Sequence, residues 1–177
     1  SQLNVCEEID SDLKSSKRMY RILQGDVGSG KTIVACLAAL NVIESNFQTA
    51  LMAPTEILAQ QHFNFFYNLI KKTNLKINIS ILTGKTDKNK KKKILEDVKN
   101  NKIDFLIGTH ALFQKNIEFK NLGLIVIDEQ HKFGVQQRIR FARKGNTNCD
   151  VLLMSATPIP RTMIMSIYGD MDTSKLT

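Results

Sequence analysis

Short runs of apolar residues alternate along the chain with longer segments in which apolar residues recur every three or four positions. The runs predict buried strands, and the spaced segments predict helices. Strands are expected at 19–25, 48–54, 77–84, 104–109, 123–129 and 150–156. Helices are expected at 31–45, 56–72 and 89–101, between the last strands, and after 155–160.

This alternation predicts an α/β fold, a three-layer α/β/α sandwich with a mostly parallel central sheet covered on both faces. The strands are almost continuously apolar, as strands buried on both faces must be. The 177 residues suffice for one domain with its own core, spanning 1–177. No internal repeat or long linker interrupts the sequence.

The residues that follow the predicted strands are small and polar. They read GDVGSGKT, APTE, LTG, GTH, DEQH and SATP. Ligands of open α/β sheets bind beyond the carboxyl ends of the strands. We therefore expect these clusters to line one edge of the sheet and to form the functional site.

The first cluster, Gly25–Thr32, matches the phosphate-binding pattern G-x-x-x-x-G-K-[ST] in full, between a predicted strand and a predicted helix. Gly28 and Gly30 let the backbone curl so that its N–H groups point at phosphate oxygens, and the helix adds the positive end of its dipole. Lys31 is expected to reach the β and γ phosphates, and the Thr32 hydroxyl to bind Mg²⁺. The residues expected to bind nucleotide are Gly25, Asp26, Gly28, Ser29, Gly30, Lys31 and Thr32.

The strand at 123–129 ends in two carboxylates, which complete this site. Asp128 is expected to hold Mg²⁺ through water, and Glu129 to orient and polarise the attacking water. Phosphoryl transfer requires positioning and charge stabilisation rather than covalent chemistry from the protein. Lys31, Asp128 and Glu129 are therefore the expected catalytic residues.

Other classes of P-loop protein fit the chain less well. The segment NKID (101–104) matches a guanine-binding signature, but it precedes its strand and no D-x-x-G occurs, which argues against a GTPase. A transporter ATPase would carry an LSGGQ-type signature, which the chain lacks. A non-catalytic module with an inactive P-loop stays as an alternative, although the intact Lys31, Thr32, Asp128 and Glu129 disfavour it.

Composition adds a polyanionic partner to this picture. The formal net charge of +8 favours nucleic acid, although much of it comes from the lysine-rich segment 85–93. The hydrophobic fraction of 42% is that of a soluble globular protein, and no apolar run approaches the roughly 18 residues of a membrane span. The three cysteines form no CxxC pair, so we expect neither a zinc site nor disulfides, and a reducing cytoplasm fits best.

The ordered set of motifs resembles the first RecA-like motor domain of superfamily 2 helicases. Its most specific pieces are QGDVGSGKT, IGTHALFQ, DEQHKFGV and ATPIPRT, and the resemblance covers nearly the whole chain. Within the superfamily, the chain is most similar to the bacterial ATP-dependent DNA helicases that remodel stalled forks and four-way junctions. The alternative is the transcription-repair coupling translocases (Mfd-type), which typically carry DEEH and a GFGKT loop, so Gln130 and Ser29 favour the former. The resemblance implies ATP and Mg²⁺ as cofactors and branched or forked DNA as a partner.

The resemblance also implies roles for further residues. Gln2 corresponds to a glutamine that reads the adenine edge and selects ATP over GTP. Gln130 and His131, together with Ser155 and Thr157, are expected to couple hydrolysis to movement on DNA. A single threonine at such a position is more simply a helix cap, but polar groups recur at successive strand ends. The residues that the resemblance implies contact the DNA backbone are Pro54, Thr55, Glu56, Thr83, Gly84 and Thr109.

Several conspicuous side chains receive no ligand-binding role. Lys88–Lys93 is expected to be a solvated helix face. His62 is expected to be packed within its helix or at its surface, and His110 to shape its loop. The aromatic residues of 63–67 are expected to lie mostly in the core, because helical spacing buries much of the cluster. Arg161 belongs to the helicase signature, but the residues define no role for it.

The sequence lacks an initiator methionine, so we expect a fragment of a longer chain. The resemblance implies a preceding wedge domain with an OB fold, and a following second RecA-like domain that supplies an arginine finger. We expect the whole protein to be monomeric, cytoplasmic and bacterial. The 177 residues alone are expected to bind nucleotide weakly and to hydrolyse it slowly or not at all.

Overall fold

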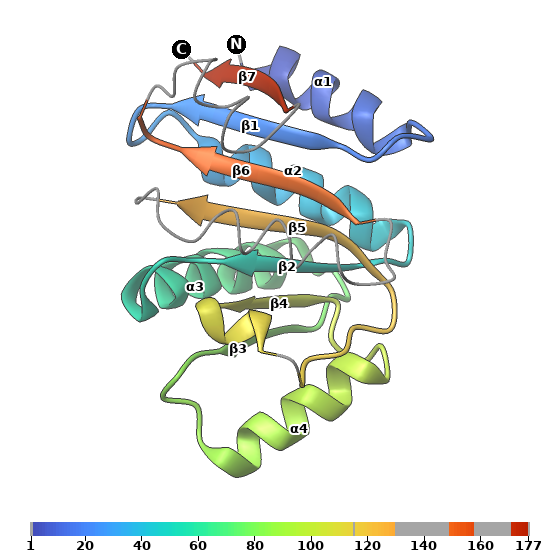
Figure 1. The fold of residues 1–177 in the computed structure, drawn as a ribbon, viewed down its shortest axis with the longest axis vertical. Helices are drawn as coiled ribbons and strands as arrows, with labels where there is room; N and C mark the ends of the chain where they lie inside the picture. Colours follow the sequence, from blue (N-terminus) through green and yellow to red (C-terminus); the bar gives the residue numbers. More distant parts are fainter. Residues whose placement is uncertain (1, 115, 130–148, 158–170, 177) are drawn as a thin grey trace.

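The fold was analysed in a computed structural model of the chain. The structure describes residues 2–114, 116–129, 149–157 and 171–176, with only the backbone at 113 and 129 (Figure 1). The helices that we expect between the last strands and after 155–160 lie outside these ranges.

A parallel sheet forms the centre of the molecule. Among the described residues it has seven strands in the order β3-β4-β2-β5-β6-β1-β7, and the pairings are parallel. The strands are β1 (Tyr20–Gly25), β2 (Gln48–Met52), β3 (Ile79–Leu82), β4 (Phe105–Gly108), β5 (Leu122–Glu129), β6 (Asp150–Ser155) and β7 (Asp172–Leu176). The predicted α/β fold with a mostly parallel sheet is confirmed.

Helices cover both faces of this sheet. They are α1 (Gln2–Lys14), α2 (Lys31–Glu44), α3 (Glu56–Thr73), α4 (Lys88–Lys99) and the short 3₁₀ helix η1 (His110–Phe113). Buried residues of α1, α2 and α3 form one core with one face of the sheet, and those of α4 and η1 form a second core with the other face. The result is the predicted three-layer sandwich (Figure 1). No helix in the described ranges is both long and apolar enough to cross a bilayer.

Helix α3 is held firmly at its start and along its buried face. The Thr55 hydroxyl accepts a hydrogen bond from the Leu58 N–H at 3.2 Å and so caps the first turn. Phe66 is 1% exposed and packs edge-on against Phe105 of β4, with ring centroids 4.8 Å apart. The expectation of an aromatic core at 63–67 therefore applies fully to Phe66, whereas the side chains at 65 and 67 lie on the exposed side.

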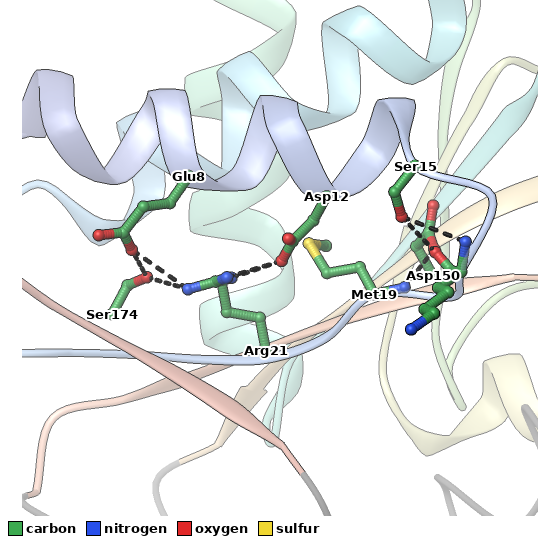
Figure 2. Close-up of polar contacts among 8 residues, drawn as sticks. Glu8, Asp12, Ser15, Met19, Arg21, Asp150 and Ser174 are labelled. Atoms are coloured by element: carbon green, nitrogen blue, oxygen red, sulfur yellow. Dashed lines mark hydrogen bonds and ion pairs between the residues drawn. The ribbon is translucent and has the colours of Figure 1, made fainter.

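A buried arginine anchors the amino-terminal helix to the sheet (Figure 2). Arg21 of β1 has a side chain only 10% exposed, and it pairs with Glu8 at 3.1 Å and Asp12 at 2.7 Å on α1. The same guanidinium donates to the Ser174 hydroxyl of β7 at 2.7 Å, and that hydroxyl also donates to Glu8. The charge of the arginine is therefore matched, and α1 and the edge strand β7 are joined to β1.

Candidate active site

The candidate functional residues lie along one edge of the sheet. Since the strands are parallel, their carboxyl ends point the same way (Figure 1). The order of the strands divides these ends into two neighbouring halves. The half expected to bind nucleotide lies at the ends of β5, β6 and β1, and the half expected to face DNA lies at the ends of β3, β4 and β2.

The loop between β1 and α2 has the backbone that its glycines permit. Gly28 and Gly30 have φ angles of 84° and 91°, in the left-handed region that other residues rarely adopt. Gly30 is the N-cap of α2 and supplies no side chain to the first N–H groups of the helix. Uncapped N–H groups at a helix start, preceded by a glycine-rich loop, suit an anion such as phosphate.

Lys31 connects this loop to the end of β5. Its ammonium donates to the carbonyls of Gly25 at 2.5 Å and Asp26 at 2.7 Å. An ammonium has three donors, so one is left for a phosphate oxygen. Burial lowers the pKa of Lys31, while the nearby carboxylates of Asp128 and Asp26 act to raise it. The lysine therefore interacts electrostatically with the strand-end aspartate, as a shared nucleotide site requires.

Gln2 lies against the phosphate-binding loop. Its side-chain amide donates to the Ser29 carbonyl at 2.9 Å, and a Cβ at Gly30 would collide with that amide. A glutamine amide has a second N–H and an oxygen acceptor, which together would match an adenine edge that presents one acceptor and one donor. The sequence patterns did not indicate the contact with the loop, because it joins residues 27 positions apart.

The oxygen donors at Thr32 and Asp128 are of the type that magnesium prefers. Magnesium is usually bound by one or two carboxylates together with substrate phosphates, rather than by a cage of protein ligands. The described part of the chain contains no cluster of three or more His, Cys, Asp or Glu residues able to hold a metal. A hydroxyl on the first turn of α2 and a carboxylate at the end of β5 therefore fit Mg²⁺.

His62 of α3 contacts the strand-end aspartate directly. Its Nε2 lies 2.6 Å from Oδ2 of Asp128, and the two side chains are only 10% and 19% exposed. We expected His62 to be packed or at the surface, with no functional contact. The residue is indeed buried, but its partner is one of the expected catalytic residues. No local pattern indicates this, because the two residues are 66 positions apart.

Two of the residues expected to couple hydrolysis to DNA, Ser155 and Thr157, lie at or just after the end of β6, beside β5. In the pairing of β5 with β6, Glu129 is opposite Ser155. The Ser155 hydroxyl donates to the Thr157 carbonyl at 3.0 Å and accepts from the Thr157 N–H at 3.3 Å, which closes a tight turn. Gln130, His131 and also Arg161 lie outside the described residues.

Two of the segments expected to face DNA meet at the other half of the edge. Glu56, at the start of α3, pairs with Lys85 at 2.9 Å, and a Cβ at Gly84 would lie 3.5 Å from the Glu56 carboxylate. The Thr83 hydroxyl accepts from the Lys85 N–H at 3.3 Å. Thr55 is exposed while capping α3, so its hydroxyl has a structural role whether or not it also meets a phosphate. The ends of β2 and β3 thus form one polar surface, beside the half-buried Pro54.

Thr109 differs from the other residues of this half. It is only 2% exposed, and its hydroxyl has no hydrogen-bond partner among the residues that the structure describes. A direct contact of this hydroxyl with DNA requires a rearrangement of the loop after β4.

Comparison with known proteins identifies relatives for this arrangement. The profile of the DEAD/DEAH box helicase family matches residues 2–165. The chain is 51% identical over 172 residues to the ATP-dependent DNA helicase RecG of Thermotoga maritima, which covers 97% of this chain and 22% of the relative. It is 48% identical over 174 residues to the RecG of Bacillus subtilis, covering 98% of this chain and 25% of the relative. The chain thus spans about a quarter of the length of these relatives.

Solved structures agree with this assignment. A structure of RecG bound to a three-way DNA junction matches 99% of this chain and 23% of its own, with a TM-score of 0.82 and 46% identity. The helicase MrfA matches 98% of this chain and 29% of its own, with a TM-score of 0.76 and 19% identity, which shows a shared fold. The expected resemblance to bacterial ATP-dependent DNA helicases is confirmed, and the transcription-repair alternative is not favoured. Because the profile covers nearly the whole chain, the chain belongs to the DEAD/DEAH box helicase family.

Proposed function

We propose that the chain is the first RecA-like motor domain of a bacterial ATP-dependent DNA helicase that remodels stalled forks and Holliday junctions in recombination and repair. The observation that carries this proposal is the arrangement at one sheet edge. A complete phosphate-binding loop with Lys31, whose pKa the nearby Asp128 acts to raise, lies at the same sheet edge as a second polar surface at the ends of β2 and β3.

On the nucleotide half, each residue has a distinct task. The N–H groups of the loop and the ammonium of Lys31 hold the phosphates of ATP. Thr32 and Asp128 would hold Mg²⁺, which would supply positive charge next to the phosphates. Glu129, at the end of β5, orients the attacking water, and Gln2 selects adenine while bracing the loop. The preorganised charges lower the barrier because they need no rearrangement during the reaction.

On the other half, the polar groups after β2, β3 and β4 hold one DNA strand by its phosphates. Hydroxyls, backbone N–H groups and lysines hold phosphate without reading bases, as a protein that moves along DNA requires. The solved RecG complex with a three-way junction supports branched DNA as the substrate. A second motor domain and a wedge domain elsewhere in a full-length protein would complete the machine, which we propose acts as a cytoplasmic monomer.

Strand separation on a synthetic three-way junction tests this proposal. The full-length protein is expected to unwind the junction only with hydrolysable ATP and Mg²⁺, and junction DNA is expected to stimulate its ATP hydrolysis. A full-length protein whose hydrolysis did not respond to branched DNA would contradict the proposal and would favour a binding module.

A further inference from the structure

We propose that His62 is a positioning residue that holds the carboxylate of Asp128 in the orientation needed for Mg²⁺ and nucleotide. This inference rests on the proposed function, because it assigns a role toward the same site. The contact that motivates it is the 2.6 Å approach of His62 Nε2 to Asp128 Oδ2 between two largely buried side chains.

The chemistry of the pair defines the direction of the hydrogen bond. An ionised carboxylate only accepts, so His62 Nε2 must carry the hydrogen and donate it. The contact occupies Oδ2 of Asp128, and the carboxylate keeps further acceptor sites for the water shell of a magnesium ion. The histidine therefore does not compete with the metal for the whole carboxylate.

The aspartate needs such a partner because its own torsion does not define its orientation. The last torsion of an aspartate side chain is broad rather than confined to one staggered value. A hydrogen bond from a fixed donor removes this freedom. Partners of this kind, which touch a metal ligand rather than the metal, are worth about 10- to 100-fold in metal affinity or activity.

The donor itself is rigidly placed. His62 lies on the buried face of α3 with Ala59, Phe66 and Ile70. The packing of Phe66 on Phe105 fixes the helix against β4. The same helix begins at Thr55 and Glu56, on the half of the edge that we propose faces DNA. His62 thus reaches from an element of one half to the metal-binding aspartate of the other.

A histidine that only packs in the core would also explain the contact. The two explanations can be separated by side chains that differ in how far their hydrogen-bond donor extends toward Asp128. A glutamine at position 62 can place its amide nitrogen near the position of Nε2, whereas an asparagine is too short. Both are neutral amides, so they differ chiefly in whether a donor reaches Asp128. His62→Leu removes the donor and keeps apolar bulk. Asn68→Ala, at an exposed position of the same helix, is the matched control.

The experiment measures binding of a fluorescent, non-hydrolysable ATP analogue to the full-length protein as Mg²⁺ is titrated. His62→Asn and His62→Leu are expected to raise the Mg²⁺ concentration at half-maximal binding about 10-fold, and His62→Gln to stay within about 3-fold of the original protein. In EDTA, the His62 variants are expected to bind the analogue as the original protein does. Asn68→Ala is expected to bind it as the original protein does throughout the Mg²⁺ titration.

Two results would overturn this inference and leave the proposed function intact. One is an unchanged Mg²⁺ requirement in His62→Asn. The other is equal impairment of the asparagine and glutamine variants, which would indicate that His62 only packs in the core. Because these two amides are judged against each other, the test stands even if His62→Leu does not fold. If the unmodified protein showed no Mg²⁺-dependent nucleotide binding, the proposed function would fail, and this inference with it.

Discussion

Ser155 of β6 lies opposite Glu129 of β5 in the parallel sheet, so the segment proposed to couple hydrolysis to DNA is adjacent to the strand proposed to carry the catalytic residues. The Ser155 hydroxyl is engaged in a turn with Thr157 rather than with nucleotide-binding residues. This placement favours a role in coupling over a direct role in binding ATP.

Replacing Ser155 should therefore affect the use of ATP more than its binding. In full-length Ser155→Ala, we expect ATP affinity and the rate of hydrolysis to stay within about 3-fold of the original protein. The number of base pairs unwound per ATP is expected to fall about 10-fold, because a loss of this size corresponds to one or two hydrogen bonds. Parallel measurements of hydrolysis and strand separation give this ratio, with the exposed Ser16→Ala as a control. A normal ratio in Ser155→Ala would exclude coupling through this turn.

Gln2 gives a second prediction, because its amide touches the phosphate-binding loop and has groups left for adenine. Gln2→Ala should weaken ATP binding about 10-fold, near the upper range for a lost hydrogen bond. GTP binding should weaken less, since GTP loses only the bracing of the loop. Equilibrium binding of both nucleotides, with Glu7→Ala on the same helix as control, measures the difference. Equal losses for both nucleotides would show that Gln2 braces the loop without reading adenine.

The buried arginine of β1 should be important for stability. Arg21→Met leaves Glu8 and Asp12 without their shared cation and Ser174 without its donor. We expect a loss of about 2 kcal/mol in the free energy of unfolding, below the full cost of breaking a buried pair because Glu8 is 50% exposed. Urea denaturation of the chain measures this. Lys17→Met, at an exposed position, should change the unfolding midpoint little, and an equally stable Arg21→Met would show that the cluster is not needed.

The two buried cysteines, Cys36 and Cys149, should react slowly with alkylating reagents while the protein is folded. Burial raises the pKa of Cys36 to about 11, and burial together with Asp150 raises that of Cys149 to about 12. At pH 8 the thiolate fraction of Cys36 should be about 100-fold below that of an unperturbed thiol, so iodoacetamide should label both residues only after unfolding. Mass spectrometry of labelled peptides tests this, and rapid labelling of the folded protein would contradict it.

These shifts also predict a loss of stability in alkali. A raised folded-state pKa means that the unfolded chain releases its thiol protons first. The contribution of Cys36 is therefore complete below the ordinary thiol pKa of 9.0 and is lost as the pH rises from there toward 11.

The sequence predicted those parts of the molecule that local patterns encode. Strands such as 123–129 are continuous apolar runs, and the phosphate-binding loop needs glycines and a lysine at fixed spacing, so both were evident. The edge strand β7 was missed because Leu176 is its one apolar residue, and α1 because it buries only Val5 and Ile9. Arg21 joins both elements to β1 through tertiary contacts with Glu8, Asp12 and Ser174, which no local pattern encodes.

The contacts that complete the candidate site were missed for the same physical reason. The approach of His62 to Asp128 depends on how α3 packs across the sheet, and no motif spans that separation. The burial of Thr109 was likewise not evident, since its position after a strand suggested an exposed hydroxyl. Motifs indicate which residues gather at the edge, but packing decides which of them touch.

The rate of ATP hydrolysis by the full-length protein, with and without forked DNA, tests the central claim most directly. The account predicts stimulation by forked DNA, and a loss on the order of 100-fold or more in Lys31→Ala, because the ammonium stabilises charge that develops on the phosphates. The exposed Lys120→Ala should hydrolyse ATP normally. A Lys31→Ala protein that kept its DNA-stimulated hydrolysis would contradict the assignment of this site.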